Sequence, residues 1–88
     1  MRIEDAQRIL KRPYVTERTF DQIEKENKIC FLVDDRVTKK QIASAVEALY
    51  EMKVKAVNTA RTIKGKKAFV RFMQENGAAS LATKLGLV

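Results

Sequence analysis

Four cationic side chains within seven residues form the part of this sequence with the clearest chemistry. The segment from Arg61 to Lys67 contains no carboxylate, and its cations are Arg61, Lys64, Lys66 and Lys67. The whole 88-residue chain has a formal net charge of +7, and residues 61–88 carry six cations against Glu75 alone. Ordinary solvated surfaces mix both signs, so this asymmetry favours a nucleic acid or another anionic surface as the partner.

Catalytic chemistry has few candidate residues in this chain. It contains no histidine, and its single cysteine, Cys30, lies within an apolar run, where a buried and unreactive thiol is the usual arrangement. The three glycines are isolated, so they form no phosphate-binding loop, and the chain lacks the Cys and His spacing of a metal site. We therefore predict that the protein is not an enzyme and uses no cofactor, metal or small-molecule substrate.

The sequence also predicts where the protein works. No apolar run approaches the roughly 20 residues of a membrane span, and the N-terminal segment lacks the apolar core of a secretion signal. A lone cysteine fits a reducing compartment. We expect a cytoplasmic protein that folds as one domain over residues 1–88, because a chain of this length has room for a single modest core.

Two strands joined by a turn would position the four cations. Lys53–Thr62 is rich in β-branched residues, Ile63–Lys67 carries a glycine, and Ala68–Met73 is apolar and aromatic at alternate positions. The sequence therefore predicts a projecting hairpin with a cationic turn at Ile63–Lys67. Alternation along the second strand places Phe69 and Phe72 on opposite faces, so they cannot form one base-stacking platform, and we expect both to belong to the core.

The rest of the chain predicts the elements on which this hairpin rests. Residues 1–7 are expected to be a polar, mobile segment. They precede a short edge strand at Arg8–Arg12 ended by Pro13, a helix capped by Thr16 and a central apolar strand at Ile29–Val33. A helix over residues 39–51 follows, and Thr38 and Gln41 have the spacing of a capping box at its start. After the hairpin comes a last helix ending near Gly86. The order is β-α-β-α-β-β-α, an α+β fold with a four-stranded antiparallel or mixed sheet packed with helices.

Lys39 and Lys40 break a local rule at the start of the helix over residues 39–51. The helix dipole disfavours cations in the first turn, where anions are stabilised instead. A tolerated surface position and a phosphate-facing position both explain them. We carry the second explanation forward as a prediction.

Five blocks of the sequence together resemble a known family. Ile9–Thr19, with the letters ILKRPYVTERT, is similar to the opening signature of the universal large-subunit ribosomal protein number twenty-three. The likeness continues through Ile29–Val33, Thr38–Ile42 with Ala45–Val46, Lys53–Val54 with Val57–Thr59, and Gly65–Val70, in the family's order and over nearly the whole chain. Each block alone is unremarkable, and the set is specific. The short hairpin turn and the last helix resemble the archaeal branch.

The resemblance implies both a fold and a place of work. The family has an antiparallel sheet of strand order 1-2-4-3. It binds large-subunit rRNA beside the exit of the nascent-chain tunnel, among neighbouring ribosomal proteins, and helps to dock the signal recognition particle and the protein-conducting channel. By match to the motif, Thr16 and Arg18 would contact rRNA and Glu17 would lie at the factor-docking position. Arg18 departs from the family's usual lysine, which alters the geometry of that contact.

These arguments give two sets of predicted site residues. The predicted rRNA contacts are Lys11, Arg12, Thr16, Arg18, Lys39, Lys40, Asn58, Thr59, Arg61, Lys64, Lys66 and Lys67. The predicted factor-docking residues are Glu17, Asp21 and Glu24, acids at i, i+4 and i+7 of one helix. The alternative function is a free-standing RNA-binding module with a regulatory or processing role. Such a module would stack bases on exposed aromatic rings, and the sequence offers few candidates for them, Tyr14 and Tyr50, which argues against it.

Overall fold

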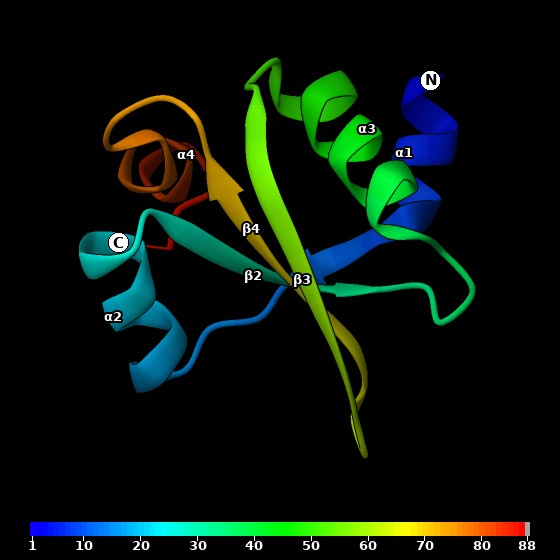
Figure 1. The fold of residues 1–88 in the computed structure, drawn as a ribbon, viewed down its shortest axis with the longest axis horizontal. Coiled ribbons are helices and arrows are strands. Elements are labelled where there is room, and N and C mark those ends of the chain that lie inside the picture. The colour runs from blue at the N-terminus through cyan, green and yellow to red at the C-terminus, as the bar shows by residue number, and fades with distance from the viewer. Residues whose placement is uncertain (88) are drawn as a thin grey trace.

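The computed structural model describes residues 1–87, which form one antiparallel sheet of four strands with four helices (Figure 1). The strand order is β1-β2-β4-β3, and every neighbouring pair is antiparallel. The predicted α+β fold and the sheet order implied by the resemblance are thereby confirmed. The elements are α1 Ile3–Ile9, β1 Leu10–Pro13, α2 Glu17–Lys25, β2 Lys28–Val33, α3 Lys39–Tyr50, β3 Val54–Thr62, β4 Gly65–Phe72 and α4 Gly77–Lys84.

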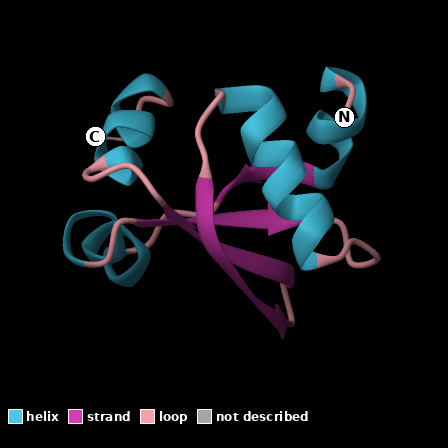
Figure 2. Ribbon diagram, turned by 45° about the horizontal axis from the view of Figure 1, so that its top comes forward, coloured by secondary structure: helices cyan, strands magenta, loops and turns pink. Residues whose placement is uncertain are grey.

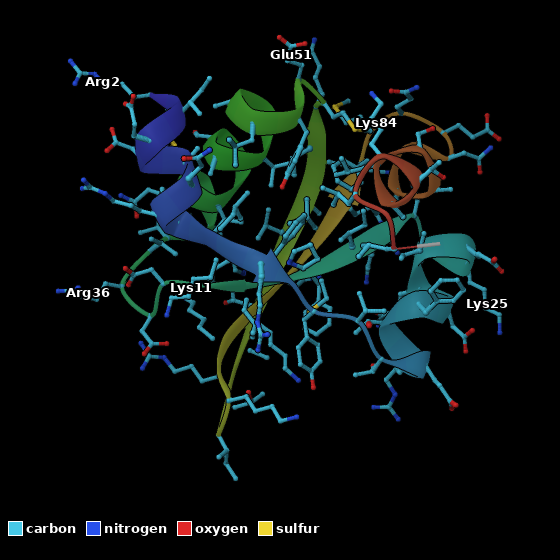
Figure 3. All side chains as sticks on the ribbon, turned by 180° about the vertical axis from the view of Figure 1, so that it is seen from behind. Arg2, Lys11, Lys25, Arg36, Glu51 and Lys84 are labelled. Carbon is cyan, nitrogen blue, oxygen red and sulfur yellow. The ribbon has the colours of Figure 1, made fainter. Side chains whose placement is uncertain are left out.

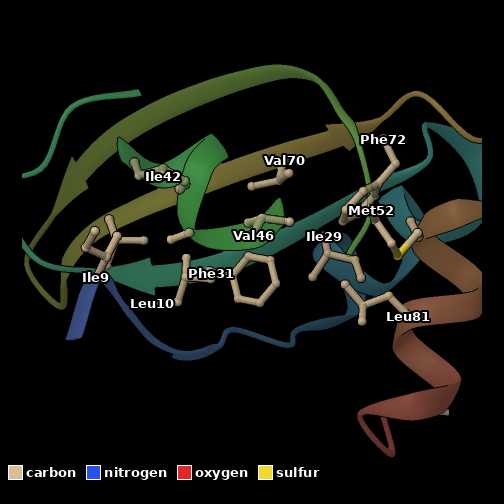
Figure 4. Close-up of a cluster of buried hydrophobic side chains, with 14 of the residues drawn as sticks. Ile9, Leu10, Ile29, Phe31, Ile42, Val46, Met52, Val70, Phe72 and Leu81 are labelled. Atoms are coloured by element: carbon tan, nitrogen blue, oxygen red, sulfur yellow. The ribbon is translucent and has the colours of Figure 1, made fainter. Parts of the chain in front are cut away.

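The core lies on one face of the sheet. Alternate residues of β2 and β4, among them Phe31 and Val70, point to the side that α3 covers, where Ile42 and Val46 complete the cluster (Figure 4). The helices α1 and α3 lie side by side over this face (Figure 2). The helix α4 adds Leu81 near Ile29 at the start of β2 (Figure 4). As predicted, β2 is central, and its residues from Ile29 to Val33 are all buried.

The opposite side of the sheet carries a different set of side chains. Register places Arg12, Lys67, Phe69, Arg71 and Asn58 there, and we call this side the polar face. The helix α2 packs beside β2, whereas Asn58 and its neighbours Ala56 and Ala60 along β3 are exposed. Phe72 belongs to the core as predicted, with 1% of its surface exposed. Phe69 is a correction, because it is half-buried on the polar face and lies outside the core cluster.

The N-terminal segment differs from its prediction. We expected residues 1–7 to be polar and mobile and Arg8–Arg12 to be extended, but Ile3–Ile9 is helical and the strand begins at Leu10. Only Ala6 and Ile9 of this helix are buried, at the place where α1 packs on α3. Two apolar residues are too few to reveal a helix in the sequence, since short helices depend on tertiary packing more than on local pattern.

Side-chain caps fix the starts of α2 and α3, as the sequence predicts. Thr38 accepts a hydrogen bond from the Gln41 amide and Gln41 accepts one from the Thr38 amide, a full capping box. Thr16 caps α2 in the same way, but its partner is the buried Thr19, whose Oγ1 accepts from the Thr16 amide at 2.7 Å. Thr19 also donates to the Tyr14 carbonyl at 3.1 Å, which ties the chain before α2 to the helix.

The hairpin turn is shorter than predicted. Thr62 pairs with Gly65, so the turn consists of Ile63 and Lys64 alone, and the predicted turn at Ile63–Lys67 is wrong. Gly65 has φ of +122°, a value that side-chain-bearing residues rarely adopt. Ile63 is fully exposed at the projecting end of the hairpin (Figure 1). The outer strand β3 is an edge of the sheet, with a shift of register between Val54 and Ala56.

No helix within residues 1–87 is both long enough and apolar enough to span a bilayer.

Candidate nucleic-acid interface

The short turn divides the four hairpin cations between the two sides of the sheet. Because Lys66 and Lys67 are consecutive strand residues, their side chains point in opposite directions. Arg61 is the cross-strand partner of Lys66 and shares its side. Lys64 approaches the same side as Lys67, since both ammonium groups lie over the ring of Tyr14. The sequence predicted one cationic tip. The structure instead divides its four cations into two pairs, one on each side of the sheet.

The first pair, Arg61 and Lys66, holds the loop between β2 and α3. Arg61 Nη2 donates to the Asp35 carbonyl oxygen at 3.2 Å, and Lys66 Nζ donates to the Val37 carbonyl oxygen at 2.7 Å. Carbonyl partners leave the positive charge in place, so these residues still contribute to the field at this end of the molecule. Part of their hydrogen-bonding capacity is already used within the protein.

The second pair, Lys64 and Lys67, surrounds an aromatic ring on the polar face. The Lys67 ammonium lies 3.9 Å from the centre of the Tyr14 ring, and that of Lys64 lies 5.8 Å from it. Both distances are within the range of cation–π attraction. A hydrogen bond from Lys67 makes the largest contribution to lowering the pKa of the Tyr14 phenol, and the positive charges of Lys64 and Lys67 lower it further. Among the described residues neither lysine forms an ion pair, so this charge is available to a ligand.

The junction between β1 and α2 brings further predicted residues to the surface. Lys11 and Arg12 are exposed on β1, and register places Arg12 on the polar face near Lys67. Arg18 is exposed in the first turn of α2. Thr16 is exposed but occupied, because its Oγ1 accepts the Thr19 amide hydrogen bond at 3.3 Å. Its capping role is thus established, and contact with rRNA stays a prediction.

Asn58 and Thr59, predicted as a pair, are separated by strand alternation. Asn58 is exposed on the polar face opposite Phe69, whereas Thr59 is half-buried on the core side opposite Ala68. Only Asn58 therefore shares a surface with Lys67 and Arg12.

Lys39 and Lys40 lie on the other side of the molecule from the polar face. Both are exposed in the first turn of α3, and they border a shallow groove between α3 and β3. Lys55 joins them in this groove, and the sequence analysis did not select it. The signal was weak, because Lys55 lies at the shift of register in β3, where alternation does not assign a face.

The predicted factor-docking acids form an exposed stripe on α2. Glu17, Asp21 and Glu24 are all exposed. A shallow groove beside them is lined by Glu17 and Asp21 together with Val15 and Phe20. Val15 is 44% exposed and adds an apolar side chain to this surface. This surface is acidic and partly apolar, in contrast to the hairpin end of the sheet.

Metal-binding groups do not cluster within the described part of the chain. No cluster of three or more His, Cys, Asp or Glu side chains that could hold a metal ion occurs among residues 1–87. Cys30 is buried, and burial raises the pKa of its thiol to about 11, which keeps it protonated and unreactive at neutral pH. The arrangement can bind a polyanion and present an acidic surface.

Comparison with known proteins identifies the family. The family described as Ribosomal protein L23 matches residues 8–84. "Large ribosomal subunit protein uL23" of Pyrobaculum aerophilum is 49% identical over 81 residues, which cover 91% of this chain and 100% of the relative. The protein of that name from Haloarcula marismortui is 40% identical over 80 residues, covering 90% of this chain and 94% of the relative.

Eukaryotic relatives are longer than this chain. The protein of the same name from Tetrahymena thermophila is 44% identical over 85 residues, which are 96% of this chain but 57% of the relative. The chain thus spans about half the length of this relative and all of the one from Pyrobaculum aerophilum. On the extent of the match and these identities, the chain belongs to the ribosomal protein L23 family.

Proposed function

We propose that this protein is a structural, non-enzymatic component of the large ribosomal subunit, working in the cytoplasm. It binds large-subunit rRNA near the polypeptide exit tunnel and helps to dock factors that receive the nascent chain. Family membership and the similarity to archaeal proteins of the large ribosomal subunit support the ribosomal role. The observation that carries the RNA-binding part is the pair Lys64 and Lys67 at the projecting end of the sheet, cations that form no ion pair among residues 1–87.

The rRNA interface would centre on the hairpin and the polar face. Lys64, Lys67, Arg12 and Asn58 would make its middle, with Lys11, Arg18, Thr16 and Thr59 around it. Arg61 and Lys66 would add charge while holding their loop, and Lys39, Lys40 and Lys55 would engage a second stretch of backbone from the α3 groove. Contacts of this kind go mainly to phosphates, so they position a protein on folded RNA without reading its sequence.

The acidic stripe on α2 would face protein. Glu17, Asp21 and Glu24 repel phosphate, and the exposed Val15 beside them offers an apolar contact that RNA backbone does not use. Neighbouring ribosomal proteins, the signal recognition particle and the protein-conducting channel are the partners implied by the family resemblance. Such factors need a surface that stays exposed after the hairpin has bound RNA, and the acidic stripe on α2 would provide it.

Co-sedimentation tests the ribosomal assignment. The tagged protein should sediment with large subunits and remain there through a moderate salt wash, while a variant with Arg12, Lys64 and Lys67 changed to alanine should be released. Arg2, Lys25 and Lys84 are exposed cations away from the hairpin tip (Figure 3), and changing these three to alanine is a control of equal charge that should stay bound. Recovery of the native protein only in the ribosome-free fraction would reject the assignment and favour the free-standing RNA-binding module.

A further inference from the structure

One row of side chains crosses all four strands on the polar face. The Tyr14 amide donates to the Cys30 carbonyl oxygen at 2.8 Å, so Tyr14 continues β1 alongside β2. Cys30 pairs with Phe69 on β4, and Phe69 pairs with Asn58 on β3. The row is therefore Tyr14, Cys30, Phe69 and Asn58. Tyr14 and Phe69 are separated by β2. Because neighbouring strands lie about 4.8 Å apart, the backbones of these two residues are about 10 Å from each other.

Neither ring of this row belongs to the core. Phe69 and Tyr14 are half-buried and lie outside the cluster of buried apolar side chains, in contrast to Phe31 and Phe72, which are fully buried within it. Cys30, between the two rings, is buried. The rings thus belong to the surface of the sheet, and each leaves part of its area to solvent.

Cations flank the row unequally. On the side toward the hairpin tip, the adjacent row contains Arg12 and Lys67, which have no ion-pair partner among the described residues. On the other side lie Lys28 and Arg71, and both are paired with Glu26, at 3.6 and 3.9 Å. A bound polyanion would therefore run along the Arg12 and Lys67 side, with its less charged groups over the rings.

We propose that the polar face is a stacking platform on which Tyr14 and Phe69 each hold an unpaired rRNA base. This inference rests on the proposed function and adds the class of RNA element that is bound. Partly exposed aromatic rings beside cations that form no ion pair suit a single-stranded segment, whose bases stack while its phosphates meet the lysines. A duplex presents phosphates and 2′-hydroxyl groups and keeps its base faces covered.

Asn58 completes the platform at the far end of the row. Its amide carries both donors and an acceptor, which can pair with the edge of a base lying on the neighbouring Phe69 ring. Lys67 has two states in this arrangement. Its ammonium lies over the Tyr14 ring in the free protein and moves to a phosphate when a base takes the ring. The sequence excluded a platform built from Phe69 and Phe72, and the fold supplies Tyr14 as the second ring instead.

The test separates ring contacts from charge contacts. Tyr14→Leu and Phe69→Leu keep an apolar side chain beside Cys30 but remove the rings, and Lys67→Ala removes a phosphate contact. Phe20→Leu, at a half-buried phenylalanine on α2, is the matched control. Binding is measured on large-subunit rRNA stripped of protein, over a series of salt concentrations. Thermal unfolding shows whether each variant is folded.

Each ring variant should bind about tenfold more weakly with an unchanged salt slope, because stacking releases no counterions. Lys67→Ala should lower the slope by about 0.7 to 0.9, and Phe20→Leu should bind as the native protein does. Native affinity in both ring variants, with the Lys67 effect intact, would overturn the platform and leave rRNA binding standing. Loss of every effect, that of Lys67 included, would count against the proposed function itself.

A second measurement covers ring variants that fail to fold. The chain has no tryptophan and two tyrosines, so Tyr50→Phe leaves Tyr14 as the only tyrosine fluorophore. Stacking of a base on this ring should quench its fluorescence when rRNA is added, and high salt that releases the RNA should restore it. Emission that stays constant through saturating rRNA would overturn the proposal for Tyr14.

Discussion

The hairpin end of the sheet and the outer face of α2 differ in the two properties that select a partner. The hairpin end carries two half-exposed rings and cations that pair with no carboxylate in the described part of the chain, whereas α2 presents three exposed acids beside an exposed valine. The first is suited to RNA and the second repels it. The two charge types are concentrated in different regions, so the proposed RNA and protein contacts would not compete, although Arg18, a proposed rRNA contact, lies on α2 beside the acids.

Reversal of charge at the hairpin should produce the largest effect. Lys64→Glu with Lys67→Glu removes two phosphate contacts and adds two repulsions, so rRNA affinity should fall by at least a hundredfold at low salt. Filter binding on stripped large-subunit rRNA measures it, with Lys25→Glu and Lys84→Glu as the control of equal charge. Equal losses in both double variants would mean that net charge matters and position does not, and the contrast between the two regions would disappear.

Charge reversal on α2 should have the complementary effect. Glu17→Lys with Asp21→Lys should weaken binding of nascent-chain factors to intact ribosomes about tenfold, in line with loss of complementary charge at an interface. Incorporation of the variant into large subunits should be unchanged. Factor binding is measured by co-pelleting with purified ribosomes, and subunit profiles report assembly. A variant that fails to enter subunits would show that this face of α2 is buried against the ribosome.

The caps provide a comparison of stability between the two regions. Thr16→Ala should lower the free energy of unfolding by about 1 kcal/mol, the usual cost of removing an N-cap, and Thr38→Ala should cost a similar amount. Urea unfolding measures both. We expect Thr16→Ala to disturb factor docking as well, because Thr16 positions Glu17, while Thr38→Ala should leave docking unaffected. Equal factor docking by the two variants would show that the Thr16 cap does not position the acidic stripe for docking.

The smallest effect concerns the thiol under the polar face. Burial raises the Cys30 pKa to about 11 from its ordinary value of 9.0, so the folded protein retains a proton that the unfolded chain loses above pH 9. This contribution to stability is complete below pH 9 and is lost as the pH rises toward 11. Urea midpoints over this range should therefore fall less steeply for Cys30→Ala than for the native protein. Parallel curves would contradict a raised thiol pKa.

Alkylation of the same thiol distinguishes the two regions directly. Iodoacetamide should react slowly with folded protein at pH 8.5, since little thiolate is present. Bound rRNA should slow the reaction further by covering the polar face, and a factor bound to α2 should not. If the factor protected the Cys30 thiol and rRNA did not, the factor would be bound to the polar face and the two proposed interfaces would have to be reversed.

Local signals in the sequence were sufficient for much of the fold. Thr16 and Thr38 mark two helix starts, and the apolar run Ile29–Val33 marks the central strand; all three predictions are confirmed. The helix α1 was missed because Ala6 and Ile9 are buried only by packing on α3, an interaction that no nearby residue encodes.

The candidate site was less predictable, because its geometry depends on register. A glycine at position 65 fits a turn of several lengths, and only the pairing of Thr62 with Gly65 separates Lys66 from Lys67. The surroundings of Phe69 could not be predicted from the sequence, because they also depend on strand register. Its neighbours on the polar face, Tyr14 and Asn58, come from strands distant in the chain, and alternation alone cannot bring them together.

The outer edge of β3 has a consequence for the protein before it meets RNA. A nine-residue edge strand exposes unpaired backbone groups that invite a second copy to add to the sheet, the first step of aggregation. Here the shift of register at Lys55 interrupts the edge, and the charges of Lys55 and Arg61 repel the same strand of another molecule. The basic residues suited to a polyanion thus also keep newly made copies of the chain apart.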